Sequence, residues 1–287
     1  MQRITPSRFG ILNKFLLPLL ILISVLFFVQ LQSQHTRAYL KIGTPPSGQS
    51  VLANNAPPAV AAKANPSPDI LNLAAQPQPI PILMYHKTPA DLPAQLEALI
   101  AKGYTSVSML QLADFFDGLS SLPAKPVVIT FDDGYGNQLQ AYEMLRARNM
   151  KATFYLITGG PGSQYCIGIT RTNTTCGDDY LKLEQVRMLS QSGLIEIGAH
   201  TTNHADLTSL SPDEQTSEMV ENKKYLEKEL NIAITTLAYP YGKFDGTTVS
   251  LAQQAGFRTA VTTIGGEMQS SNNRFTLLRV RDATLLP

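Results

Sequence analysis

The chain has 287 residues, of which 44% are hydrophobic, and its formal net charge is +1. This length and composition can supply the core of one good-sized domain, but they lack the strongly basic balance of a nucleic-acid-binding protein, so no nucleic-acid partner is expected. There is no tryptophan, so any surface on which a sugar ring stacks must be built from Tyr or Phe.

The N-terminal segment is predicted to anchor the chain in a membrane. Residues Phe15–Leu31 are uncharged and apolar, and Arg3, Arg8 and Lys14 precede them. The run is close to the length that spans a bilayer core of ~30 Å, and it exceeds the apolar core of an ordinary signal peptide. Residues 1–34 are therefore interpreted as a cytoplasmic stub and an uncleaved signal-anchor in the inner membrane, with the remaining chain on the periplasmic or extracellular side. Secretion after signal cleavage is the alternative.

The next segment has the composition of a linker. Residues 35–79 are rich in Pro, Ala, Ser and Asn and offer little apolar periodicity. Such segments do not build a core, so this part of the chain is predicted to be a tether. The folded domain is then predicted to cover residues 80–287.

Strands and helices alternate from residue 80 onward. The pattern predicts strands at 80–86, 126–134, 151–157, 195–200, 234–242, 258–263 and 275–282, and helices at 92–104, 107–119, 137–150, 180–193, 211–230 and 247–256. The strands are apolar throughout, which is typical of parallel strands covered by helices. We therefore predict an α/β fold, a (β/α) barrel that is complete or one unit short, with an open doubly wound sheet as the alternative.

Two cysteines, Cys166 and Cys176, lie in one loop-like stretch. In an exported domain they are candidates for a disulfide, and two free thiols are the alternative. Zinc binding by this pair is disfavoured, because the C-x-x-C spacing is absent.

The residues that carry chemistry follow the predicted strands. Asp132 and Asp133 come after one strand, His200 and His204 after another, and His86 after the first. In both architectures the active site lies at the C-terminal ends of the strands. Two histidines four residues apart, with one carboxylate, give the open three-ligand set of hydrolytic zinc, or of ferrous iron in an oxygenase.

The two adjacent aspartates are expected to have different roles. Neighbouring side chains diverge, so one carboxylate can bind the metal while the other accepts a proton from the metal-activated water. The structural alternative is that Asp133 serves only as the turn residue before Gly134, which leaves Asp132 unexplained.

The motifs TFDDG, HTTNH and YPYG, in this order, resemble those of the polysaccharide deacetylases of carbohydrate esterase family 4, the NodB-homology domain. The resemblance implies that Asp132 is the catalytic base and that Asp133, His200 and His204 bind one divalent metal ion. Zinc is the expected ion, with nickel, cobalt or iron as alternatives. The resemblance also implies that the backbone N–H of Tyr241 stabilises the oxyanion, a role suited to a preorganised donor.

The chain departs from the common family pattern in its supporting residues. Ala238 stands where an arginine is usual, and the late tryptophan motif and the C-terminal Leu-x-His are absent. The segment PILMYHKT resembles a subgroup acting on poly-β-1,6-N-acetylglucosamine, whose acid histidine comes early, which implies that His86 is the general acid. Arg279 and Arg281 are candidates to replace the missing arginine or, alternatively, exposed residues of a strand end.

The resemblance predicts a hydrolase of carbon–nitrogen bonds other than peptide bonds. The expected function is metal-dependent N-deacetylation of a GlcNAc-containing polysaccharide, such as poly-N-acetylglucosamine, peptidoglycan or a chitin-like oligomer. Two alternatives stay open: a catalytically inert sugar-binding domain on a membrane tether, and an amide hydrolase for a small non-carbohydrate substrate. The expected partners are the polysaccharide and, through the N-terminal helix, the membrane.

Overall fold

The computed structural model describes residues 65–159, 180–281 and 283–287, which all belong to one compact unit, Ala62–Pro287. The predicted signal-anchor Phe15–Leu31, the tether up to residue 64, and both cysteines lie outside these ranges, and what the sequence analysis says of them remains a prediction. Among the described residues, no helix is both long and apolar enough to cross a membrane.

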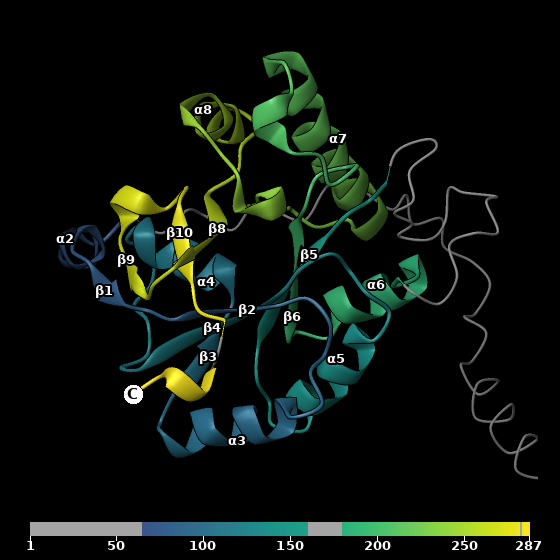
Figure 1. Ribbon diagram of the computed structural model, residues 1–287. Helices are drawn as coiled ribbons and strands as arrows, with labels where there is room; N and C mark the ends of the chain where they lie inside the picture. Colours follow the sequence, from purple (N-terminus) through teal and green to yellow (C-terminus); the bar gives the residue numbers. More distant parts are fainter. Residues whose placement is uncertain (1–64, 160–179, 282) are drawn as a thin grey trace, which may run out of the picture. The chain divides into compact units, whose positions relative to one another are not determined.

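The centre of the unit is a parallel sheet that curls into a barrel (Figure 1). Its strands, in pairing order, are β10 (Leu277–Arg279), β8 (Thr259–Gly265), β7 (Thr236–Ala238), β6 (Ile195–Ala199), β5 (Ala152–Leu156), β4 (Pro126–Phe131) and β2 (Ile82–Tyr85). The short strand β3 (Thr105–Val107) pairs with β4 outside this path.

The two ends of the strand path meet. Leu83 of β2 forms a parallel bridge with Val280, next to β10. The amide of Met84 donates to the carbonyl of Val280 (2.9 Å), and the amide of Val280 donates to the carbonyl of Ile82 (2.8 Å). The predicted barrel is thus confirmed in a nearly closed form, and its path has one strand fewer than the eight of a complete (β/α) barrel.

Helices cover the outside of this barrel. They are α2 (Pro68–Ala75), α3 (Leu92–Ala101), α4 (Met109–Phe116), α5 (Gln138–Arg146), α6 (Leu183–Gln191), α7 (Pro212–Leu230) and α8 (Gly246–Gln254). Short 3-10 turns occur at η1 (Leu207–Ser209), η2 (Pro240–Gly242), η3 (Ser271–Asn273) and η4 (Ala283–Leu285). Since helices pack on the outer face while side chains fill the interior, every residue of β4 and β5 is buried.

Local signals explain where several helices begin and end. Ser211 and Glu214 form the capping box that starts α7, with the Ser211 hydroxyl accepting from the amide of Glu214. Gly103 adopts a φ of 80° just after α3, a conformation that glycine takes without strain.

The end of the predicted tether is wrong. Residues 68–79, assigned to the tether by their Pro- and Ala-rich composition, form helix α2 and strand β1 (Gln78–Pro79). Strand β1 pairs with β9 (Met268–Gln269), and Ala74 of α2 is fully buried. The folded domain therefore begins before residue 80, because a few apolar side chains are enough to dock a short helix on an existing core.

The N-terminal end of the barrel is closed by α4. The amide of Met109 donates to Thr153 Oγ1 (3.2 Å), and the amide of Leu110 donates to Glu196 Oε2 (2.8 Å), near the starts of β5 and β6. Phe115 and Phe116 join the inward-facing strand residues in one apolar cluster. The opposite, C-terminal end is the end at which the polar candidates of the sequence gather.

Candidate active site

Three candidate metal ligands converge at the C-terminal ends of β4 and β6. Asp133 follows β4, His200 follows β6, and His204 lies in the loop beyond. One ligand atom from each lies within 4.8 Å of the others. Asp133 Oδ1 is 3.3 Å from His200 Nε2 and 3.5 Å from His204 Nε2. The structure thus brings together the three residues that the sequence predicted.

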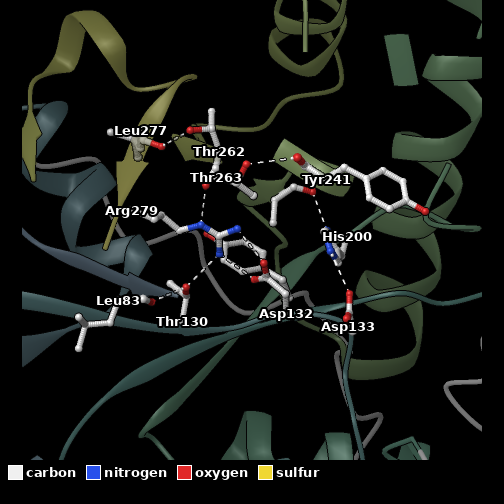
Figure 2. Close-up of polar contacts among 12 residues, drawn as sticks. Leu83, Thr130, Asp132, Asp133, His200, Tyr241, Thr262, Thr263, Leu277 and Arg279 are labelled. Atoms are coloured by element: carbon white, nitrogen blue, oxygen red, sulfur yellow. Dashed lines mark hydrogen bonds and ion pairs between the residues drawn. The ribbon is translucent and has the colours of Figure 1, made fainter. Parts of the chain in front are cut away.

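The chemistry of this trio fits a divalent cation. Asp133 Oδ1 is buried and accepts no hydrogen bond from the residues that the structure describes, although two imidazole nitrogens lie near it. His200 Nδ1 lies 2.8 Å from the carbonyl oxygen of Ala238, so Nδ1 carries the proton and donates it there. The lone pair of Nε2 then faces Asp133 (Figure 2), the orientation in which a metal-binding histidine is held by its second nitrogen.

The electrostatics of the trio suit the same purpose. Burial raises the pKa of Asp133, but the neighbouring imidazoles lower that pKa by a larger amount. The net pKa is therefore below its ordinary value, and the carboxylate is ionised at neutral pH. Burial and the nearby His200 lower the pKa of His204 to about 4, so its ring is neutral. Burial lowers the pKa of His200, and the two aspartates raise it more. An ionised Asp133 and a neutral His204 are already in the forms that bind metal ions, whereas a metal ion would compete with a proton at His200.

The backbone around the trio is strained. Four non-glycine residues there have positive φ values: Asp133 (72°), Thr201 (62°), His204 (55°) and Tyr241 (60°). Each such residue costs on the order of 1–3 kcal/mol, and strain of this kind gathers at functional sites, where it aims side chains that a relaxed backbone would misplace.

The second aspartate has a different environment. Asp132 is 2% exposed and forms a two-pronged ion pair with Arg279, which is 1% exposed. Arg279 Nη1 donates to Asp132 Oδ1 (2.8 Å), and Nη2 donates to Oδ2 (2.7 Å), as Figure 2 shows. Burial raises the pKa of Asp132, and the guanidinium lowers it by more, so the carboxylate is ionised. Arg279, from the last strand of the path, thus provides Asp132 with a cationic partner, which Ala238 cannot provide.

Arg279 is itself held by the barrel interior. Its Nε donates to the carbonyl of Thr262 (2.6 Å), and Nη1 also donates to Thr130 Oγ1 (3.1 Å). The Thr130 hydroxyl in turn donates to the carbonyl of Leu83 (2.7 Å). The sequence analysis missed Thr130 and Thr262, although Thr130 could have been found as a hydroxyl two residues before Asp132, on the same side of an otherwise apolar strand.

The remaining candidates lie at the rim. His86 is exposed directly after β2, and it follows Tyr85, whose carbonyl accepts a hydrogen bond from the amide of Asp132 (2.9 Å). His86 makes a minor electrostatic contribution to the lowered pKa values of Asp132 and Asp133. Arg281 is exposed, and the ion pair with Asp132 is made by Arg279.

Tyr241 stands against the metal trio. The residue is 57% exposed, and its ring packs edge-on against the His204 ring, with centroids 4.6 Å apart. The Tyr241 carbonyl accepts from Thr263 Oγ1 (3.2 Å). Gly242 follows with φ 70°, and a Cβ there would lie 2.2 Å from Thr263 Oγ1. The backbone of Tyr241 and Gly242, the last two residues of YPYG, therefore packs directly against Thr263 of β8.

Comparisons with known proteins identify relatives of this chain. The family model "Polysaccharide deacetylase" matches residues 120–260. The Bacillus subtilis protein YxkH, named as a candidate polysaccharide deacetylase, is 30% identical over 216 residues, covering 72% of this chain and 72% of that protein. The poly-beta-1,6-N-acetyl-D-glucosamine N-deacetylase of Escherichia coli is 24% identical over 211 residues, covering 62% of this chain and 31% of that protein.

Solved structures show the same fold. The Streptococcus pyogenes deacetylase PplD, in complex with acetate, aligns with a TM-score of 0.60 and 30% identity, covering 72% of this chain and 93% of that one. IcaB from Ammonifex degensii aligns with a TM-score of 0.60 and 24% identity over the same shares, 72% and 93%.

Proposed function

Because the chain belongs to the polysaccharide deacetylase family, whose members are hydrolases of carbon–nitrogen bonds, we propose that it is a metal-dependent N-deacetylase of a GlcNAc-containing polysaccharide. The observation that carries the proposal is the pairing of a complete Asp-His-His trio with a second, ionised aspartate beside it. An inert sugar-binding domain would have no use for either the converging ligands or a buried carboxylate held charged by Arg279.

Asp133, His200 and His204 would hold the metal. The buried Oδ1 of Asp133 and the Nε2 atoms of the two histidines are the donor atoms, and nitrogen and oxygen donors of this kind suit zinc, with nickel, cobalt and iron as alternatives. When bound, such an ion polarises a carbonyl oxygen and lowers the pKa of water at its open position.

Asp132 would act as the general base. The attacking water forms a bond to the acetamide carbon and gives one proton to the Asp132 carboxylate. Arg279 keeps that carboxylate ionised and fixes its orientation through two hydrogen bonds. The Tyr241 amide, in the strained η2 turn, would stabilise the negative charge that develops on the acetyl oxygen.

His86 would complete the reaction as the general acid. Breaking the carbon–nitrogen bond leaves an amine that must take up a proton, and the products are acetate and the free amino sugar. His86 follows β2, which pairs with β4, so it flanks the aspartates across neighbouring strands. Histidine is the side chain that most often gives a proton in general acid catalysis.

The substrate proposal rests on the relatives and on the position of the acid. Proteins named as poly-beta-1,6-N-acetyl-D-glucosamine N-deacetylases are 24% identical to this chain. An early histidine after the first barrel strand is the feature that the sequence shares with that subgroup. We therefore place β-1,6-linked poly-N-acetylglucosamine first among the candidate polymers. The predicted anchor Phe15–Leu31 would hold the enzyme on the outer side of the membrane, where such polymers are exposed.

The test is an assay of acetate release. Purified protein, with and without a chelator, is given β-1,6-linked GlcNAc oligomers, β-1,4-linked GlcNAc oligomers and a small acetamide. We expect release from the β-1,6 oligomers, loss with chelator, and recovery on adding zinc. Release from the small acetamide alone would support the non-carbohydrate alternative. Sugar binding without acetate release under any metal would support an inert binding domain and overturn the proposal.

A further inference from the structure

The proposed metal ligand His204 lies at the end of a turn whose strained backbone is stabilised largely by hydrogen bonds to other parts of the protein. The turn runs from His200 to His204, and both Thr201 and His204 adopt left-handed φ values. Threonine is branched at Cβ and disfavours this conformation strongly. One bond inside the turn, from the amide of His204 to Thr201 Oγ1 (3.0 Å), helps to close it. Further hydrogen bonds to the turn come from outside it.

Helix α7 holds this turn through Glu218. The Glu218 carboxylate accepts from the backbone amide of Asn203 (2.7 Å) and from its side-chain Nδ2 (2.6 Å). The carbonyl oxygen of Glu218 accepts from the amide of Thr202 (3.0 Å) and from its hydroxyl (3.2 Å). Hydrogen bonds to an ionised carboxylate are shorter and stronger than neutral ones. Glu218 therefore grips the two residues just before His204.

One helical turn after Glu218, Asn222 forms a hydrogen bond to Thr201, at the start of the same turn. Residues four apart on a helix share a face, and Asn222 is fully buried. Its Nδ2 donates to the carbonyl of Thr201 (2.5 Å). The same group donates to the carbonyl of Leu156 (3.0 Å) and to Thr158 Oγ1 (3.0 Å), at the end of the neighbouring strand β5. Asn222 thus ties the left-handed Thr201 to the barrel.

We propose that Glu218 and Asn222 are positioning residues for the metal site, holding the Thr201–Asn203 turn so that His204 faces Asp133 and His200. Neither residue is among the candidate ligands; both act through the turn. The inference rests on the proposed metal-dependent function. It adds that the affinity for the metal depends on helix α7, which carries none of the ligands.

The test compares variants on one face of α7 with a control on the same helix. Glu218→Ala removes the carboxylate, and Glu218→Gln keeps the shape and one acceptor without the charge. Glu221→Gln is the control, since Glu221 is exposed and pairs only loosely with the exposed Lys224 (3.4 Å). The dissociation constant for Zn²⁺ is measured by competition with a chromogenic chelator. The visible spectrum of Co²⁺-loaded protein reports the ligand geometry, and thermal melting of the metal-free protein reports the fold.

We expect Glu218→Ala to weaken Zn²⁺ binding by about 10–100-fold, the usual effect of losing a partner that orients a ligand. Glu218→Gln should fall between Glu218→Ala and the wild type, and Glu221→Gln should match the wild type. The Co²⁺ spectrum of Glu218→Ala should change while its metal-free melting temperature shifts little. Asn222→Asp, which places an acceptor against two carbonyl oxygens, should weaken binding in the same direction.

The outcomes separate this inference from the proposed function. If the wild-type protein bound no divalent ion, the proposed function would fail, and this inference with it. If the wild type bound Zn²⁺ and His204→Ala lost it, but Glu218→Ala kept the wild-type affinity and Co²⁺ spectrum, only the inference about α7 would be wrong. A lower melting temperature with unchanged metal affinity would mean that Glu218 serves the fold alone.

Discussion

The buried pair of Asp132 and Arg279 offers a sharp test of how this site is held together. The change is Arg279→Met, which keeps an unbranched apolar stem and removes the charged guanidinium. In the native protein the guanidinium donates to both oxygens of Asp132, to the Thr130 hydroxyl and to the carbonyl of Thr262. The variant loses all four hydrogen bonds at once. It leaves Asp132, only 2% exposed, without the guanidinium that pairs with both of its oxygens.

The expected loss of stability is large because one partner of a buried ion pair is removed. Breaking such a pair costs about 3–5 kcal/mol, most of it from the carboxylate left uncompensated. For a domain of this size each kcal/mol lowers the melting temperature by about 2–4 °C. Urea unfolding, monitored by far-UV circular dichroism, measures the difference in the free energy of unfolding between variant and wild type. An unchanged dependence of that free energy on urea concentration would indicate that the folded state is intact.

Two further variants isolate the cause. Arg281→Met removes an exposed arginine two residues away and should change the stability by less than about 0.5 kcal/mol. The double variant Asp132→Asn/Arg279→Met removes both charges and should be more stable than Arg279→Met alone, since no unpaired charge remains. If Arg279→Met unfolded within about 1 kcal/mol of the wild type, or if the double variant were the less stable protein, the argument from the buried charge would be refuted.

Four other predictions follow from the site and the barrel. Asp132→Asn should keep its bound zinc, measured by elemental analysis, and lose about 10²–10⁴-fold in kcat; zinc loss would mean that the two aspartates have been exchanged. His204→Ala should bind zinc much more weakly in chelator competition, and full zinc content would remove His204 from the ligand set. His86→Ala should lose deacetylation yet still hydrolyse an activated aryl acetate, whose leaving group needs no proton; equal losses on both substrates would argue against an acid role. Burial raises the pKa of Glu196 to about 7, so the folded state keeps a proton that the unfolded chain releases, and wild-type stability should fall as pH rises from about 4.5 to 7. Glu196→Gln should remove that fall, gaining on the order of 1–3 kcal/mol over the wild type at pH 8 and almost nothing at pH 4 in urea unfolding; parallel pH profiles would contradict it.

The sequence was sufficient to predict the barrel and the convergence of the three candidate metal ligands. Parallel strands end at one edge of the sheet, so polar residues directly after apolar strands had to meet there. Asp133 after β4 and His200 after β6 obey this rule. The close approach of the His204 ring could be predicted from the four-residue spacing, although the turn is built from left-handed residues rather than from a helix.

The choice between Arg279 and Arg281 could not be made from the sequence. The two arginines are separated by one residue, so the alternation of side chains along a strand would point both to the same side of the sheet. Strand β10 ends at Arg279, and the next residue, Val280, forms the bridge with Leu83 that closes the barrel. A contact between the first and last strands leaves no local signal in the chain.

Helix α2 was missed for a related reason. The composition of residues 35–79 is that of a linker, and the helical stretch within it is only eight residues long. A helix of that length is not stable by itself. It forms here because it packs on α4, and Leu71 meets the backbone of Gly118 closely, where the φ of 73° requires glycine. Such tertiary support is decided by residues far along the chain, whereas composition reports only the local average.

The two adjacent aspartates show how one backbone change separates two chemical tasks. Asp132 still belongs to the extended strand edge, since its amide donates to the carbonyl of Tyr85, and its side chain points into the barrel toward Arg279. At Asp133 the φ turns to 72°, and the next carboxylate faces the histidines instead. A relaxed, extended Asp133 would send its side chain to the opposite side of the strand, away from any ligand set that includes His200. The strain at Asp133 is therefore the feature that would allow neighbouring carboxylates to serve as the proposed base and the proposed metal ligand without competing for the same partner.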